Sequence, residues 1–284
     1  MLAQKYLFIL LLGLGSGEKI PLDDFVYNDS DLNIAKWRLI NSTINNNQTI
    51  YKLKITTLKW FDDSLSNNSI WKHDLYITVP SNLNPNNPLF YYIHSAEDDL
   101  TDLGYVSNIS NKCRCITITI RQIPNQPIKF TDDPSGKGRV EDEIIAWTMG
   151  LYLTDGRLKF PNKTYENIPL LFPMTKAAKR GMDLAINFLK IKGYNFTEKF
   201  IPSGKSKRGW TTWLLTAIDT RVIASVPIVY DIINWNLIIH DQYMSLGGRY
   251  SFALEDYFNQ NITESIDSLE FYDLRRLIDP LSKT

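Results

Sequence analysis

Residues 200–213, FIPSGKSKRGWTTW, decide the fold, because they combine a strand, a glycine-flanked turn and the start of a helix. The apolar residues before Gly204 predict the strand, and the run from Gly209 to Ile218 predicts the helix. Ser206 lies at the apex of the turn between them. This arrangement is typical of the nucleophile elbow of hydrolases, where a glycine two residues before the serine leaves room for a sharp, strained turn.

The turn departs from the pattern G-x-S-x-G in one place. Arg208 occupies the position of the second glycine, and Gly209 follows one residue later. Such a triplet is compatible with a nucleophilic Ser206, and equally with an ordinary strand-to-helix turn in which the serine caps the helix. In the first case the helix N-terminus would offer partial positive charge and free N–H groups to an oxyanion.

Apolar runs in the second part of the chain predict further strands. They are Leu89–Ile93, Cys115–Ile120, Lys199–Pro202 and Arg221–Val229. Short, continuously apolar runs are typical of strands that are buried on both faces, and the intervening segments are long enough for crossover helices. The clearest predicted helix is Thr175–Lys192, which Gly193 ends, and Glu141–Leu153 predicts another. We therefore expect an α/β domain over residues 89–284, with a mostly parallel sheet and flanking helices.

The preceding segment has a different pattern. Thr49–Ile55, Leu58–Phe61 and Leu75–Val79 predict strands, whereas the polar segments 41–48 and 62–69 predict breaks between them. Residues 80–88 are dense in Asn and Pro and predict a loop. We expect residues 18–88 to form an N-terminal, glycosylated, β-rich region.

The first seventeen residues have the features of a secretory signal peptide. A basic start is followed by the apolar stretch Tyr6–Leu14, which is too short to span a bilayer, and by small residues up to Gly17. The alternative is a buried N-terminal helix. We expect cleavage after Gly17 and a secreted, extracellular protein, since no other apolar stretch is long enough to cross a membrane.

Eight Asn-x-Ser/Thr triplets agree with secretion, because this triplet is the acceptor for N-glycosylation. They begin at Asn28, Asn41, Asn47, Asn67, Asn108, Asn162, Asn195 and Asn261. Some arise by chance in a chain this rich in Asn, but their spread along the sequence favours surface glycosylation.

Composition limits the classes of function. With 31 basic and 31 acidic residues among 284, the chain has no overall charge to attract nucleic acid or an anionic membrane, and we expect neither as a partner. We expect no cofactor. Cys113 and Cys115 are too few for a metal site and alternate along a predicted strand. They could be buried thiols, a strained bridge or links to another chain.

The elbow is one of several distinctive strings that follow one another along the chain. They are Trp71-Lys72-His73, Val79-Pro80, 122–127 (QIPNQP), 139–142 (RVED), 145–147 (IAW), 173–178 (PMTKAA), Met182-Asp183, 204–213 (GKSKRGWTTW), Asp219, Arg221-Val222, Pro227, 231–234 (DIIN), Gly247-Gly248, Asp256-Tyr257 and Asp279-Pro280. Through these strings, residues 50–280 resemble the PhoPQ-activated pathogenicity-related protein family.

The resemblance implies an α/β-hydrolase-like fold with Ser206 in the nucleophile position. It also implies an acidic residue and a histidine after Asp279-Pro280, in the order Ser, Asp, His. The sequence ends at Thr284. We therefore expect a core that lacks its C-terminal strands and the acid and base of a triad.

His240 is the one histidine that follows Ser206, and it is a weak candidate for the base. It could reach the serine with Asp231 or Asp241 orienting it, or it could pack on the surface. His73 belongs to a family string and is expected to be structural.

His94 ends the first predicted parallel strand, where the resemblance implies a glycine-rich oxyanion loop. The sequence instead continues with Ser95 and Ala96 and then with Glu97, Asp98 and Asp99, whose carboxylates would oppose an oxyanion.

Charged residues near the elbow leave two interpretations open. Lys207 and Arg208 either bind an anionic group at the pocket mouth or pair with a buried carboxylate such as Asp183 or Asp231. The string Arg139–Asp142, with Glu141 inside it, either forms a polar cluster or is a charged helix start.

We expect a catalytically impaired secreted glycoprotein that acts as an extracellular signal repressing proliferation, as the resemblance implies. Its expected partner is a cell-surface receptor or another secreted protein. The alternative is a secreted serine hydrolase, an esterase or aminopeptidase-like enzyme that uses Ser206 with His240 or with groups from a partner. A third interpretation is an incomplete gene product that folds poorly.

Overall fold

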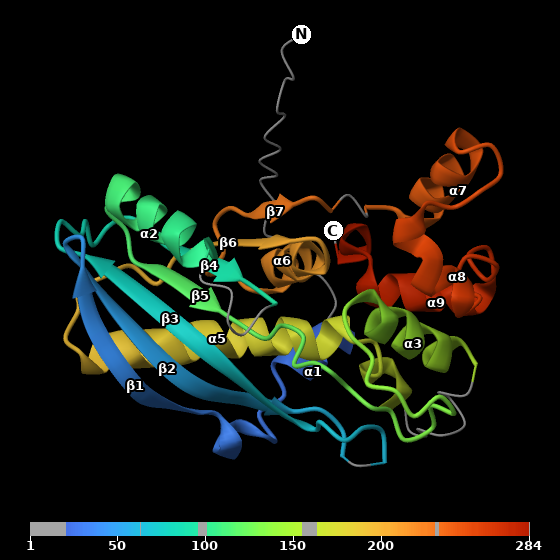
Figure 1. Cartoon of the computed structure of the whole chain (residues 1–284), viewed down its shortest axis with the longest axis horizontal. Coiled ribbons are helices and arrows are strands. Elements are labelled where there is room, and N and C mark those ends of the chain that lie inside the picture. The colour runs from blue at the N-terminus through green and yellow to red at the C-terminus, as the bar shows by residue number, and fades with distance from the viewer. Residues whose placement is uncertain (1–20, 63, 96–100, 155–163, 231–232, 284) are drawn as a thin grey trace, which may run out of the picture.

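The computed structural model describes residues 21–62, 64–95, 101–154, 164–230 and 233–283, which form an α/β fold around one mixed sheet (Figure 1). The seven strands have the order β1-β2-β3-β5-β4-β6-β7. They are β1 (Lys36–Asn45), β2 (Gln48–Lys59), β3 (Ile70–Pro80), β4 (Leu89–Ile93), β5 (Thr117–Ile120), β6 (Phe200–Lys205) and β7 (Val226–Ile228). Pairing is antiparallel from β1 to β5 and parallel from β5 to β7.

The parallel half of the sheet confirms the interpretation of the apolar runs. β4 has the predicted bounds, whereas β5 begins two residues later than the run that predicted it. β6 continues beyond the predicted end at Pro202 to Lys205, directly before Ser206. β7 is shorter than predicted, because only Val226–Ile228 pairs with β6 and Val222 makes just an isolated bridge to Phe200.

The prediction of a break over residues 41–48 is wrong. Residues 41–45 belong to β1, and only Asn46 and Asn47 form the turn to β2, both with positive φ (47° and 59°). Two left-handed residues are what a tight two-residue hairpin turn requires, and asparagine tolerates them better than most side chains. β2 also joins two predicted strands into one, with an irregularity in its pairing between Thr56 and Leu58.

The predicted boundary at residue 88 lies inside this single sheet. β3 pairs directly with β5, so the strands of residues 18–88 continue the sheet of the core. Among themselves, the described strands of residues 89–284 pair only in parallel, as predicted. The antiparallel half of the mixed sheet is contributed by the N-terminal strands.

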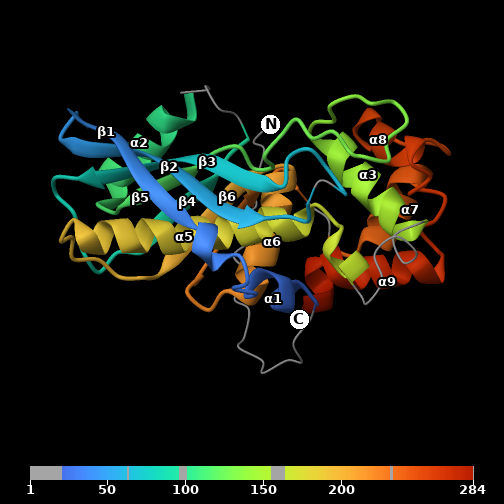
Figure 2. The same ribbon diagram turned by 90° about the horizontal axis from the view of Figure 1, so that it is seen from below.

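Helices cover both faces of the sheet (Figures 1 and 2). α5 (Leu171–Ile191) packs along β1, β2 and β3 and against α6 (Lys207–Ile218), while α2 (Thr101–Cys113) lies over β3, β4 and β5 on the other face. α5 begins four residues before its predicted start, because Pro173 is tolerated in a first helical turn. Gly193, at φ +77°, follows its end as predicted.

A lobe of short helices lies at one end of the sheet (Figure 1). It contains α3 (Asp142–Leu153), α7 (Trp235–Ser245), α8 (Glu255–Asn259) and α9 (Leu269–Ile278). The remaining short helices are α1 (Pro21–Val26), η1 (Leu32–Ile34), η2 (Thr164–Asn167), η3 (Phe252–Leu254) and η4 (Pro280–Lys283). No helix in the described ranges has the length and apolar character that a membrane span needs.

The C-terminal residues are tied to the core by three hydrogen bonds. The carboxylate of Asp279 accepts the backbone N–H of Asn234 and Trp235 and so caps the N-terminus of α7. The indole of Trp210, on α6, donates to the carbonyl of Ile278 at 2.6 Å. The family string Asp279-Pro280 therefore has a structural role.

Gly181 lets α5 approach the sheet closely. A Cβ atom at this position would lie 2.5 Å from the Tyr91 hydroxyl oxygen and 2.8 Å from Cδ1 of Ile120. The Tyr91 hydroxyl cannot move away freely, because it donates to the carbonyl of Ala178 at 2.8 Å. Glycine is thus required here for packing rather than for backbone freedom.

We expect Gly181→Ala to lower the free energy of unfolding by about 1 to 3 kcal/mol, because the added methyl group overpacks the core. The matched control is Gly104→Ala in α2, where a Cβ would meet nothing within 4 Å. That change should raise stability by up to about 1 kcal/mol, since alanine is the better helix former. Urea denaturation of both variants measures the difference, and equal effects would contradict the packing role of Gly181.

His73 is a neutral, fully buried residue in β3. Its Nδ1 lies 2.8 Å from the Arg121 carbonyl oxygen and its Nε2 lies 3.0 Å from the Thr57 hydroxyl. Burial lowers the pKa of His73 from 6.5 to about 4, although the backbone hydrogen bonds oppose this shift. The histidine predicted to be structural is therefore part of the hydrophobic core.

The unfolded chain binds a proton at His73 at a higher pH than the folded chain does. The contribution of neutral His73 to the free energy of unfolding is fully present above pH 6.5. It is lost as the pH falls toward 4, and the loss amounts to about 3 kcal/mol. We expect His73→Gln to remove this part of the pH dependence, which denaturation series at several pH values would show as a shallower slope. An unchanged slope would mean that His73 is not buried as a neutral group.

Candidate active site

Ser206 lies between the last residue of β6 and the first residue of α6, as the elbow pattern predicts. Its backbone has φ 56° and ψ −128°, a conformation that is rare for a residue with a side chain and that stores strain. The Ser206 N–H donates to the Ile228 carbonyl of β7 at 2.9 Å, and the Ser206 carbonyl accepts from Gly209 at 2.7 Å. Backbone hydrogen bonds on both sides therefore hold the strained turn.

Two glycines make this turn sterically feasible. A Cβ at position 204 would lie only 2.6 Å from the Arg208 carbonyl oxygen, because α6 turns back directly over β6. At position 209 it would lie 3.1 Å from the Cβ of Tyr230 and 3.2 Å from the Gly204 carbonyl oxygen. Gly209 thus performs the close packing that the elbow pattern assigns to a glycine one residue earlier, so Arg208 is accommodated.

The side chain of Ser206 is half-buried and does not cap α6. Within the described ranges, Oγ makes no hydrogen bond, and the backbone N–H of Lys207 makes none either. In a hydrolase elbow, the N–H after the nucleophile helps to hold the oxyanion. The turn therefore presents a nucleophile position and one oxyanion donor, without a base beside them in the part of the chain that is described.

The histidine candidate for the base is engaged elsewhere. His240 lies on α7, and its Nε2 is 2.9 Å from Oδ1 of Asp267, with both side chains exposed. Of the two predicted orienting residues, Asp241 is exposed on α7 and does not make this contact, and Asp231 lies outside the described residues. The structure does not bring His240 and Ser206 together into a hydrogen-bonded pair.

The region after β4 gives only part of the predicted oxyanion loop. His94 is half-buried, its ring centroid is 5.8 Å from that of Tyr92, and its backbone accepts a hydrogen bond from Ile123. Ala96, Glu97, Asp98 and Asp99 lie outside the described residues.

Lys207 and Arg208 both bind the carboxylate of Glu141, an arrangement here called the clamp. Lys207 Nζ lies 2.6 Å from Oε2 of Glu141 and 2.9 Å from Asp142. Arg208 binds both carboxylate oxygens, with 2.7 Å between Nη1 and Oε2. The two basic side chains are only 4% and 7% exposed. The interpretation that they pair with a carboxylate is confirmed, but Asp183 is not the partner, because it pairs with Arg221 and Lys179. Asp231 lies outside the described residues.

Glu141 is held in a second strained turn at the start of α3. Its φ of 55° and ψ of −128° match those of Ser206 to within a degree. Gln126 fixes it by donating to the Glu141 carboxylate at 2.7 Å and by accepting from the Glu141 N–H at 2.8 Å. Burial alone would raise the pKa of Glu141, but hydrogen bonds and charge from Arg208 and Lys207 outweigh it and lower the pKa to about 2. Glu141 and Asp142 thus belong to a polar cluster with Lys207 and Arg208 at the start of α3, whereas Arg139 pairs separately with Asp133.

The cysteines do not share a strand, contrary to prediction. Cys113 is the last residue of α2 and is exposed, whereas Cys115 is buried just before β5. Both thiols are free, and burial raises the pKa of Cys115 to about 11. In the described ranges, no group of three His, Cys, Asp or Glu side chains is arranged to hold a metal ion.

The predicted glycosylation sites lie on the surface where the structure describes them. The asparagines Asn28, Asn41, Asn47, Asn67, Asn108, Asn195 and Asn261 are all exposed. Asn162 and the predicted signal peptide lie outside the described residues.

Known proteins resemble this chain in sequence and in fold. The chain is 34% identical, over 98% of its length, to autocrine proliferation repressor protein A from Dictyostelium discoideum, and it spans 54% of that relative. Acetyl xylan esterase 1 from Thermoanaerobacterium sp. shares the fold, with TM-score 0.53 and 14% identity over 91% of this chain and 73% of that one. Acetyl xylan esterase from Paenibacillus sp. R4 does so with TM-score 0.52 and 10% identity, over 93% and 80% of the two chains.

The structural likeness shows that the chain shares the α/β-hydrolase fold of these two proteins and, at such low identity, nothing about substrate. The family comparison is more specific, because the model of the PhoPQ-activated pathogenicity-related proteins matches residues 22–283. This span contains the elbow, the clamp on Glu141 and the cap by Asp279. The chain therefore belongs to the PhoPQ-activated pathogenicity-related protein family.

Proposed function

We propose that this protein is a secreted, N-glycosylated signalling protein that slows cell proliferation and does not act as a hydrolase. Its relationship to a proliferation repressor supports the signalling part of the proposal. The chain spans about half the length of that relative, and the proposal extends to this chain the activity that the name of the whole relative states.

Exposure of the predicted glycan acceptors supports secretion. An acceptor asparagine needs a solvent-accessible amide, and the seven described acceptors are all exposed. Asn41 and Asn47 lie on the edge strand β1 and its turn, and Asn195 follows α5, so glycans there would project from the surface without disturbing the core.

One observation supports the loss of catalysis. Ser206 Oγ makes no hydrogen bond in the described ranges, whereas a serine becomes a nucleophile at neutral pH only with an adjacent base. The basic residues that follow Ser206 do not replace the missing base. Lys207 and Arg208 are fixed on Glu141, so they stabilise the turn rather than contact a substrate.

A serine hydrolase is the second candidate, and the strained turn itself favours it. Strain at a non-glycine residue is commonly retained where function needs it. The free N–H of Lys207 and the accessible Ser206 would serve acyl transfer if a base came from another chain or from residues that the structure does not describe.

Comparing wild type with Ser206→Ala separates the two candidates. We expect no labelling of either protein by a fluorophosphonate probe, under conditions in which an active serine hydrolase is labelled. We also expect both proteins, made through a secretory pathway, to lose mass on enzymatic deglycosylation and to slow the proliferation of Dictyostelium discoideum cells equally. Labelling that Ser206→Ala abolishes would establish the hydrolase, and absence of any effect on proliferation would refute the signalling role.

The clamp is expected to matter for stability, since it holds two nearly buried cations. We expect Glu141→Gln to lower the free energy of unfolding by about 2 to 4 kcal/mol, because Lys207 and Arg208 would lose their shared negative charge. The matched control is Glu143→Gln, which removes the charge that pairs with the half-exposed Lys137 and keeps an oxygen that can accept from the Val140 N–H. It should cost about 0 to 1 kcal/mol. Similar losses in chemical denaturation would show that the clamp has no special role.

A further inference from the structure

We propose that the face of strands β1, β2 and β3 opposite α5, where α2 leaves it uncovered, binds an acidic polysaccharide carrying sulfate or carboxylate groups. This surface, here called the basic face, consists of Lys36, Arg38, Lys52, Lys54 and Lys72. The proposal needs the extracellular location proposed above, but it depends neither on Ser206 nor on an effect on proliferation.

The register of the sheet places these side chains together. Arg38 is directly opposite Lys54 across β1 and β2, and Lys36 and Lys72 flank Thr56 from the two neighbouring strands. Residues paired directly across strands project from the same face, as do residues two apart in one strand. All five basic side chains therefore project from one side of the sheet.

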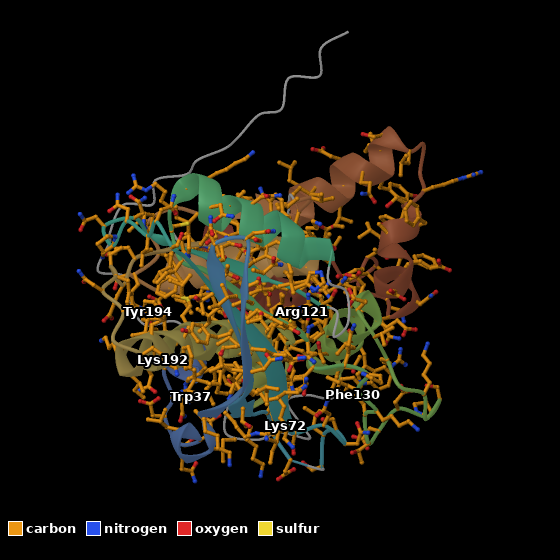
Figure 3. The ribbon with its side chains drawn as sticks, turned by 60° about the vertical axis from the view of Figure 1, so that its left-hand side comes forward. Trp37, Lys72, Arg121, Phe130, Lys192 and Tyr194 are labelled. Carbon is orange, nitrogen blue, oxygen red and sulfur yellow. The ribbon has the colours of Figure 1, made fainter. Side chains whose placement is uncertain are left out.

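The opposite side of the same strands is the hydrophobic core. Leu53 and Leu75 are fully buried there, and Trp37 packs edge-on against Phe188 of α5. The basic face is thus the side that α5 does not cover. In Figure 3, Lys72 of this face and the neighbouring Arg121 are labelled on the other side of the blue strands from Trp37, Lys192 and Tyr194. Lys36, Arg38 and Lys72 are exposed, and Lys52 and Lys54 are partly so.

The charge of this surface is strongly one-sided. Strands β1 to β3 contain six Lys or Arg residues and one acidic residue, Asp74, although the whole chain has 31 of each sign. Asp74 is shared by Lys52 at 3.3 Å and Lys54 at 2.8 Å. Lys36, Arg38 and Lys72 make no ion pair with any residue in the described ranges. These three charges remain available to a ligand.

The geometry favours a linear polymer with repeated anionic groups. Neighbouring strands are separated by about 5 Å and alternate residues in one strand by about 7 Å, so the basic face offers cations over roughly 10 Å in each direction. Arginine matches the two oxygens of a carboxylate or sulfate through its planar fork, and lysine adds point charges around it.

The same face is poorly suited to nucleic acid. Binding of single strands uses exposed aromatic rings on which bases stack. The aromatic residue on this face, Tyr76, is only 9% exposed, with Lys52 Nζ 5.4 Å and the Arg121 guanidinium 5.0 Å from its ring centre. Charge is therefore presented here without a stacking surface.

One predicted glycan borders the basic face. Asn41 pairs with Lys52 across β1 and β2, on the side away from Lys36 and Lys72. A glycan on Asn41 would limit the surface along this boundary and leave the charges of Lys36, Arg38 and Lys72 accessible.

The test measures binding of the purified chain to heparin, a sulfated polysaccharide probe, at about 0.15 M salt and along a salt series. The test variant changes Lys36, Arg38 and Lys72 together to Thr, which suits an exposed strand. The control variant changes the exposed residues Lys112, Lys199 and Arg249 together to Gln, with the same loss of three charges. All three proteins are measured with their glycans and after deglycosylation, and circular dichroism verifies their folding.

We expect wild type and the control variant to bind heparin alike, and the test variant to bind at least about tenfold more weakly. The slope of log K against log salt should also be shallower by about two to three in the test variant, because fewer counterions are released. Equal weakening of both variants, or no heparin binding by wild type, would overturn the proposal. Tighter binding to single-stranded DNA or to phosphatidylserine vesicles than to heparin would overturn the assignment to a polysaccharide. None of these readouts involves proliferation, so failure here is distinguishable from failure of the proposed function.

Discussion

The close approach of α6 to β6 is the constraint on which the rest of this structure depends. Only a glycine fits at position 204, because the carbonyl oxygen of Arg208 occupies the space of its side chain. This contact forces Ser206 into its strained conformation and aims Lys207 and Arg208 at Glu141. It also brings Trp210 to the C-terminal segment, where its indole stacks on Trp235 and donates to Ile278. The elbow thus connects the sheet, the start of α3 and the C-terminal lobe.

Much of the parallel half could be predicted from the sequence, and the reasons are local. β4 and α6 are buried, so their apolar pattern and flanking glycines mark them clearly. β1 was not predictable in this way, because most of its residues are exposed and its polar sequence resembles a loop. Its strand conformation comes from pairing with β2, which no local pattern contains.

In the candidate site, too, the features set by neighbouring residues were predictable and those set by distant residues were not. The turn at Ser206 follows from neighbouring residues and was predictable, together with the need for Gly204 and Gly209. The partner of Lys207 and Arg208 was not, because Glu141 lies more than sixty positions away and depends on Gln126 for its conformation. Net charge was misleading for a similar reason: a chain with 31 residues of each sign concentrates basic residues on β1 to β3, and only strand register reveals this.

The exposed pattern of β1 has a consequence for the solubility of the protein. A strand at the end of a sheet presents unpaired backbone groups that can join another sheet and start aggregation. Charged side chains such as Lys36 and Arg38 resist this edge-to-edge association, and the irregular pairing between Leu39 and Asn41 interrupts the flat edge. At the other end of the described sheet, β7 offers only three residues to a neighbour. The two ends of the described sheet therefore differ, because one is protected by charge and irregular pairing and the other is short.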